Sequence, residues 1–134
     1  MLIGIGVALI LLRAGIDVFV QVTMISGIAS IIPDIDLKYK HRKLMHNITA
    51  CLLASLIVML LTSSIMYFKA FIIGYLTHIL LDMTTIRGVY LFYPVSNKSV
   101  RIANLRSDSF MLNMIGNITG LALILAWLIM LFRA

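Results

Sequence analysis

Five apolar stretches occupy most of the 134 residues and limit the chain to folds made of packed helices in a membrane. They run over residues 2–12, 18–32, 48–68, 70–81 and 110–132. Two of them, 48–68 and 110–132, are each long enough to cross a hydrocarbon core about 30 Å thick, which takes about 20 helical residues. The other three suit tilted, buried or partly re-entrant helices. We therefore predict an all-α fold, a polytopic membrane bundle of four to five apolar helices.

The composition supports this class. Hydrophobic residues make up 62% of the chain and charged residues 12%, whereas soluble domains carry about 25% charged residues. Neither a linker nor an internal repeat divides the sequence, so residues 1–134 are expected to form a single integral-membrane domain. Arg13 follows the first apolar run and no basic residue precedes it, the reverse of the charge order in a signal peptide. We therefore expect this run to belong to the fold.

The residues between the apolar stretches predict where the elements end. Pro33 ends the second stretch, because the residue before a proline is biased away from helix. Beyond it we expect, in order, a loop over 33–47, a long helix to about Phe68, a tight turn at Lys69, a shorter helix to Asp82 and an irregular connection over 84–109. A short amphipathic piece is expected around Ser99–Arg106.

Basic residues are distributed unevenly between the two ends of the predicted bundle. Alternating the spans places eight of them on the face shared by 33–47 and 84–109, and three on the opposite face. The first group is Lys38, Lys40, Arg42, Lys43, Arg87, Lys98, Arg101 and Arg106, and the second is Arg13, Lys69 and Arg133. The positive-inside rule makes the richer face cytoplasmic in a multi-pass protein of the cell membrane. Much of the net charge of +6 then serves orientation and contact with lipid phosphates, and no nucleic-acid partner is expected.

All three His residues and three of the five Asp residues lie in two short segments of this apolar chain. The segments, IIPDIDLKYKHRKLMH and GYLTHILLD, both fall at the predicted cytoplasmic face. Burying an ionisable side chain without a partner in lipid costs several kcal/mol, so such residues are rare there and usually functional. Their shared location predicts a metal site. The candidate ligands are Asp34, Asp36, His41, His46, His78 and Asp82.

The spacing within the second segment suits a metal. His78 and Asp82 are four residues apart in a helical run, so both side chains project from one face. One helix can thus offer an imidazole nitrogen and a carboxylate oxygen to the same ion. Gly74, one turn earlier, would let another helix approach closely. The alternative for this pair is a buried His hydrogen-bonded to Asp.

The first segment offers two further pairs. Asp34 and Asp36 follow Pro33, which favours extended geometry, and in an extended chain residues i and i+2 point to the same side. Two such carboxylates can converge on one cation; the alternative is a solvated turn in which an Asp caps a helix end. His41 and His46 flank a basic pair, and either His, taken alone, could be an anchor at the membrane interface.

The PDID…HRxxxH element, followed by GYLTHILLDMTTIRGVYLFYP, resembles the YdjM-type family of membrane-bound metal-dependent hydrolases. The resemblance covers about residues 27–96, at Asp34, Asp36, His41, Arg42, His46, Gly74, His78, Asp82, Thr85, Gly88, Val89 and Pro94. It implies a helical membrane enzyme that holds metal through the Asp and His residues. It also implies a remote resemblance to the zinc-dependent phospholipase C and P1 nuclease group. Family members usually carry a His near the start of the chain, whereas the first thirteen residues here contain none, so the number of ions stays open.

This ligand set defines the expected chemistry. Imidazoles with carboxylates suit Zn²⁺ first, with Mn²⁺ or Fe²⁺ as alternatives, and six ligands allow one or two ions. Zinc lowers the pKa of bound water toward neutrality, which favours hydrolysis. Arg42 could bind a phosphate through two contacts or anchor the chain to lipid headgroups, and Thr85 could orient a ligand or bond the backbone. The predicted protein is a membrane-bound hydrolase of a phosphoester or phospholipid-like substrate, with Arg42 and Thr85 in catalytic roles and membrane lipids as partners.

Two other classes remain open from the sequence. A divalent-cation or proton transporter would need polar groups along a path across the bilayer, and the opposite half offers few of them. A metal-stabilised structural or assembly protein would use the same ligands to close one end of the bundle. Gly116 and Gly120 form a GxxxG spacing, which suits close packing within the bundle or a homo-oligomer.

Overall fold

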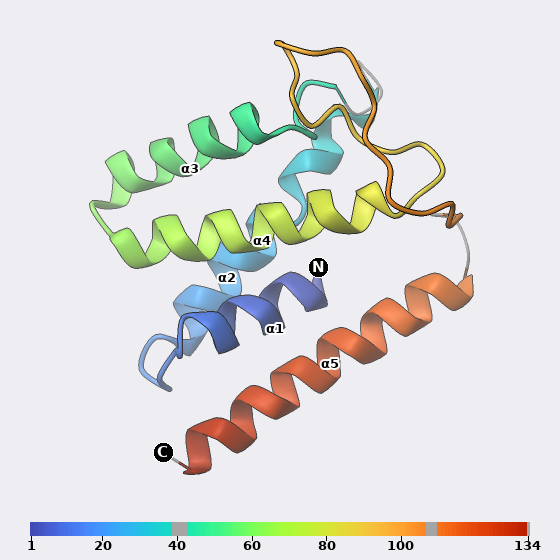
Figure 1. Ribbon diagram of the computed structural model, residues 1–134. Coiled ribbons are helices and arrows are strands. Elements are labelled where there is room, and N and C mark those ends of the chain that lie inside the picture. Colours follow the sequence, from blue (N-terminus) through green and yellow to red (C-terminus); the bar gives the residue numbers. More distant parts are fainter. Residues whose placement is uncertain (39–42, 107–109, 134) are drawn as a thin grey trace.

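Over the residues that the structure describes, the chain is helical. The computed structural model describes residues 1–38, 43–106 and 110–133, apart from the side chains of 36–38 and 110–112. The elements in order are α1 (Leu2–Leu11), α2 (Phe19–Ala29), the 3₁₀ helix η1 (Ile32–Lys38), α3 (Ile48–Thr62), α4 (Ile65–Met83) and α5 (Phe110–Arg133). Successive α-helices run back and forth, so the α1–α2 and α3–α4 connections lie at one end and η1 with the connection after α4 at the other (Figure 1). The all-α prediction is confirmed.

The turn between α3 and α4 lies at Ser63 and Ser64. Ser63 ends α3 in the left-handed conformation with a φ of 51°, and the Ser64 hydroxyl accepts a hydrogen bond from the Tyr67 backbone N–H at the start of α4. Serine favours caps and turns because its hydroxyl competes for backbone hydrogen bonds. The expected helix over 48–68 and the turn at Lys69 are therefore wrong, and α4 is longer than predicted, at 19 residues.

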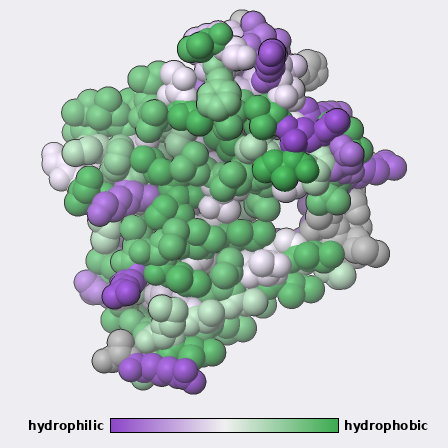
Figure 2. Space-filling view, in the orientation of Figure 1, coloured by the Kyte–Doolittle hydropathy of each residue, from purple (hydrophilic) through white to green (hydrophobic). Residues whose placement is uncertain are grey.

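Two of the described helices are long and apolar enough to cross a membrane, namely Ile65–Met83 and residues Asn113–Arg133 of α5. The apolar helices α1, α2 and α3 are shorter, so the number of spanning helices falls below the four to five predicted. The stretch 48–68 does not cross as one helix because the chain turns at Ser63. In the orientation of Figure 1, Figure 2 shows hydrophobic residues over most of the visible face of the molecule, with hydrophilic residues gathered toward its margins.

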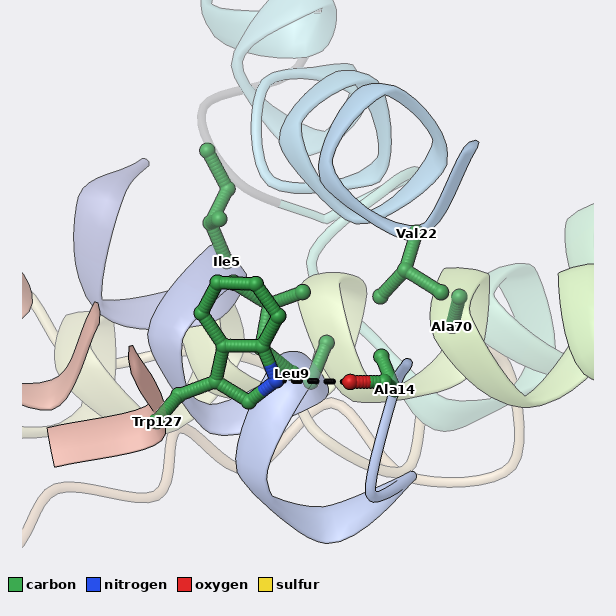
Figure 3. Packing of buried hydrophobic residues seen from close by; sticks show 7 residues of the cluster. Ile5, Leu9, Ala14, Val22, Ala70 and Trp127 are labelled. Carbon is green, nitrogen blue, oxygen red and sulfur yellow. Dashed lines mark hydrogen bonds between the residues drawn. The ribbon is translucent and has the colours of Figure 1, made fainter. Parts of the chain in front are cut away.

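The helix α4 lies at the centre of the bundle, where it contacts α1, α2, α3 and η1, whereas α5 packs against α1. At the end away from η1, Trp127 of α5 is buried beside Leu9 and Val22, and its indole N–H donates a hydrogen bond of 2.8 Å to the Ala14 carbonyl (Figure 3). A second apolar cluster joins α3, α4 and the connection after α4, around Tyr75 and Val89. These two cores fix both ends of α4.

Two glycines allow helices to cross with their backbones in contact. A Cβ atom at Gly74 would lie 2.9 Å from the Ser26 Cα of α2, and one at Gly120 would lie 2.7 Å from the Ile3 backbone nitrogen of α1. The close approach predicted at Gly74 is thus confirmed. At Gly116 a Cβ would meet only the Ile3 Cδ1 atom, at 3.9 Å. Within the described bundle Gly120 packs against α1, and a homo-oligomer through the glycine pair stays a prediction.

The connection after α4 is irregular, as expected, but it contains no helix around Ser99–Arg106. Val89 and Val100 exchange two backbone hydrogen bonds in an antiparallel bridge. Farther along, the Ile102 and Leu105 N–H groups donate to the Met83 and Thr84 carbonyls. The last carbonyls of a helix have no partner within it, so this extended segment satisfies the end of α4 and cannot coil into a helix of its own.

Candidate metal centre

Four of the six predicted ligands meet at the end of the bundle that holds η1. Asp34 comes from η1, His46 from the segment before α3, and His78 with Asp82 from α4. Asp82 Oδ2 lies 3.1 Å from His46 Nε2 and 3.7 Å from His78 Nε2. The same His78 Nε2 atom lies 3.5 Å from Asp34 Oδ1. Residues 48 positions apart in the sequence are thereby brought to one point.

Three of these residues form a group that could hold a metal ion. One ligand atom each from Asp34, His46 and His78 lies within 4.8 Å of the other two. The His46 and His78 rings are 5.4 Å apart between centroids. Asp82 lies against both rings and completes the cluster, which we call the His–Asp cluster (Asp34, His46, His78 and Asp82). Four of the six residues predicted from composition, location and spacing thus lie together in the structure.

The four side chains of the His–Asp cluster differ in how far they are buried. The His46 side chain is fully buried, those of His78 and Asp82 are 14% and 15% exposed, and that of Asp34 is 46% exposed. A catalytic metal site keeps one coordination position open, whereas a structural site closes all of them. The exposure of Asp34 gives the cluster one side that a small molecule can approach.

The two imidazoles carry buried nitrogens that suit a metal. Both ring nitrogens of His46 and the Nε2 atom of His78 have no hydrogen-bond partner among the described residues. The 3.1 Å approach of His46 to Asp82 is close enough for an ion pair but does not have hydrogen-bond geometry. An unsatisfied buried polar atom costs about 1–3 kcal/mol, and neutral imidazole nitrogens are common metal ligands. The residues therefore fit a bound divalent cation.

His78 and Asp82 lie on α4, and contacts between α4 and α2 help to hold them in place. The pair lies four residues apart in α4, and the predicted shared face is confirmed by their 3.7 Å contact. The backbone of Ser30, at the end of α2, lies beside the His78 ring, and the Ser30 hydroxyl donates to the Gly74 carbonyl of α4. Groups around a metal-binding imidazole help to fix its orientation. The predictions from sequence missed Ser30, which is an ordinary residue in an apolar run.

The position of His46 depends on two residues that the sequence analysis did not single out. Asn47 is the N-cap of α3: its side-chain oxygen accepts from the Ala50 N–H, and its amide donates to the Lys43 and Leu44 carbonyls. The buried Tyr75 donates its hydroxyl to the Met45 carbonyl. An Asn directly before an apolar run is a recognised signal for a helix start, so Asn47 was open to prediction. Nothing local in the sequence pairs Tyr75 with Met45.

The geometry expected around Asp34 differs from the observed one. Residues Ile32–Lys38 form a 3₁₀ helix, in which side chains three apart are aligned. The extended backbone predicted after Pro33 is therefore wrong. Asp34 still reaches His78. The side chain of Asp36 lies outside the description.

The structure describes only one of the three remaining residues that the sequence analysis assigned to the site. His41 and Arg42 lie outside the described residues. The Thr85 hydroxyl donates a hydrogen bond of 2.8 Å to the Asp82 carbonyl, so the backbone role considered for it is confirmed, and a role in orienting a ligand stays a prediction. The Lys43 ammonium lies 4.6 Å from the centre of the Tyr90 ring, a cation–π contact beside the cluster.

Comparison with known proteins supports the resemblance noted in the sequence. A family model described as YdjM inner membrane protein matches residues 1–134. No curated protein and no solved structure matches the chain. The two-part motif from Asp34 to Pro94 lies within this match, and the two apolar helices of spanning length agree with a membrane location. Since the match covers the whole sequence, the chain belongs to the YdjM inner membrane protein family.

Proposed function

We propose that this protein is a membrane-bound, metal-dependent hydrolase that acts on a phosphoester, such as a phospholipid-like molecule, at the cytoplasmic interface. The observation that carries the proposal is the His–Asp cluster, with Asp34, His46 and His78 offering ligand atoms within 4.8 Å of one another. Buried ionisable residues at membrane depth usually mark a functional site. The cluster joins η1, the segment before α3 and α4.

A divalent cation would be held by Asp34, His46 and His78, with Asp82 beside both imidazoles. Mixed nitrogen and oxygen ligands favour Zn²⁺, with Mn²⁺ or Fe²⁺ as alternatives, and Asp36 and His41 are the candidates for a second ion. Such a cation supplies Lewis acidity and makes water a better nucleophile at neutral pH. Asp82 orients the two rings, and the half-exposed Asp34 carboxylate lies on the side from which a phosphate can arrive.

The proposal is tested at Arg42, the candidate phosphate ligand. We expect Arg42→Ala to keep its metal content and melting temperature but to hydrolyse bis(4-nitrophenyl) phosphate about 10²–10³-fold more slowly, the usual cost of removing one group that stabilises developing charge. Arg42→Lys should recover only part of this rate, because an ammonium cannot make the planar two-point contact. Arg133→Ala, at the opposite end of the bundle, is the control. Full activity in Arg42→Ala would show that Arg42 does not bind the substrate phosphate and would favour its role as a headgroup anchor. If the wild type shows no metal-dependent hydrolysis, the proposal that the protein is a hydrolase is refuted.

We further propose that the cluster faces the cytoplasm in a multi-pass arrangement. The connection after α4 lies at the cluster end of the bundle (Figure 1) and carries Arg87, Lys98, Arg101 and Arg106. Positive charge in short loops favours the cytoplasmic side.

Cysteine labelling in intact cells tests this orientation. In a Cys51→Ala background, Lys98→Cys should resist a membrane-impermeant maleimide added from outside, because it lies at the proposed cytoplasmic end. Ser63→Cys, in the exposed turn at the other end, should react. The reverse pattern would invert the topology.

One observation favours a second candidate, a metal-stabilised structural protein. The His–Asp cluster ties η1 and the start of α3 to α4, so a cation there would also close this end of the bundle. The exposed side of Asp34 favours the enzyme, because a purely structural site gains nothing from an accessible ligand.

A further inference from the structure

A cavity of about 470 Å³ lies beside the His–Asp cluster. It is enclosed by the first residues of α1, the last turn of α4, the connection after α4 and the first half of α5. The opening is visible in Figure 2 to the right of the centre, above α5. Ligand sites in proteins are commonly clefts of about 300–1,000 Å³, so this cavity has the size of a binding site.

The cavity and the His–Asp cluster share Asp82. This carboxylate lines the cavity and, through Oδ2, contacts both His46 and His78. Thr85, whose hydroxyl bonds the Asp82 carbonyl, also lines it. A molecule in the cavity therefore lies next to the residues that would hold a metal.

The lining combines two kinds of surface. Leu2, Ile3 and Ile115 supply apolar walls, and Asn113 and Asn117 of α5 supply amide groups. The two Asn residues are four apart and so share a helix face, in a helix that is otherwise strongly apolar. Polar side chains in a membrane helix are rare and usually functional.

We propose that this cavity binds the hydrocarbon chain and the adjoining ester linkage of a membrane phosphoester, with its phosphate at the His–Asp cluster. The inference rests on the proposed function and names the substrate class as a lipid-like molecule. Apolar walls can contact the hydrocarbon chain of a lipid that enters from the bilayer, and the Asn amides can bond ester oxygens. A small water-soluble phosphoester would leave the apolar walls unused.

Filling the cavity tests the proposal. Gly116 lines it, and a Cβ there meets only a flexible Ile3 methyl group at 3.9 Å, so a side chain can start at this position without meeting backbone, and Gly116→Phe is designed to fill the cavity. Thr119→Phe fills it from the neighbouring turn and serves if Gly116→Phe folds poorly. Ala122→Phe adds the same ring to an exposed position of α5 outside the lining and is the matched control.

The readout is photolabelling of purified protein by a dodecyl phosphonate with a diazirine on its chain, which cannot be hydrolysed. We expect the label on peptides containing Leu2 or Ile115, and competition by unlabelled dodecyl phosphonate but not by methyl phosphonate. Gly116→Phe should reduce this labelling at least about tenfold, a change of about 1.4 kcal/mol in binding, and Ala122→Phe should not reduce it.

Labelling does not depend on turnover, so the two proposals fail separately. Label only on residues outside the cavity lining, or equal labelling of Gly116→Phe, Thr119→Phe and wild type, would refute the lipid cavity even if small phosphoesters are hydrolysed. Specific labelling without hydrolysis of any phosphoester would keep the cavity as a lipid site and refute the hydrolase.

Discussion

Replacing His78 with Ala is expected to remove most of the transition metal that co-purifies with the protein. His78 offers one of the three grouped ligand atoms and lies within 3.7 Å of both Asp34 and Asp82. Changing a group that merely supports a metal ligand costs 10–100-fold in metal affinity, so losing a ligand should cost at least about 100-fold. The measurement is metal content per protein after gentle purification.

The same substitution should lower the melting temperature of protein purified with its metal. A ligand that binds only the folded state stabilises it by about 2.7 kcal/mol when its free concentration is 100 times its dissociation constant. The His78→Ala variant, which no longer binds the metal, should lose this stabilisation. Thr77→Ala is the matched control, since the neighbouring hydroxyl bonds only the Ile73 carbonyl of its own helix. Wild-type protein without stoichiometric Zn, Mn or Fe, or a His78→Ala variant with full metal content, would refute the metal centre.

The sequence predicted those parts of the fold and site that follow from local periodicity. The helical spacing of His78 and Asp82 sets their shared face, and Gly74 one turn earlier marks a close crossing, whatever the rest of the chain does. The gathering of ionisable residues in two segments also indicated that these segments meet. Composition and motif together led to the correct family.

Features that depend on hydrogen-bond competition were predicted less well. At Ser63 a helix that hydrophobicity alone would continue is ended by the left-handed residue and the Ser64 cap. After Pro33 the chain coils into η1 where an extended segment was expected. Around Ser99–Arg106 the backbone instead bonds the end of α4. At Ser63 and Ser64 the deciding hydrogen bonds are local, whereas for residues 99–106 they are made with the end of α4.

Contacts between distant residues were beyond prediction from one sequence. Asp34 contacts His78 because η1, which follows α2, lies against the C-terminal half of α4. His46 contacts Asp82 because the Tyr75 hydroxyl binds the Met45 carbonyl next to His46. Composition indicated that the two segments meet, but not which pairs of residues come into contact. The cavity beside Asp82 likewise arises from the crossing of α1 with α5, which only the packed structure defines.

The crossing of α2 and α4 therefore controls the site, and Gly74→Ala is expected to disrupt both stability and metal binding. The added Cβ would overlap the Ser26 backbone, whose Cα lies 2.9 Å from that position, and a backbone cannot rotate away as a side chain can. Overpacking of this kind costs about 1–3 kcal/mol. Because α2 carries Ser30 and leads into Asp34, moving it away from α4 separates both residues from His78.

Gly27→Ala on α2 is the matched control, because the change is the same and only its surroundings differ. A Cβ at Gly27 would meet the flexible Ile5 Cδ1 atom at 3.4 Å, an ordinary contact. Alanine favours a helix over glycine by about 1 kcal/mol, so Gly27→Ala should match or exceed wild type in melting temperature and keep its metal. Gly74→Ala should lose both. If the two variants behave alike, helix propensity outweighs the backbone contact, and the approach of α2 to α4 does not hold Asp34 against His78.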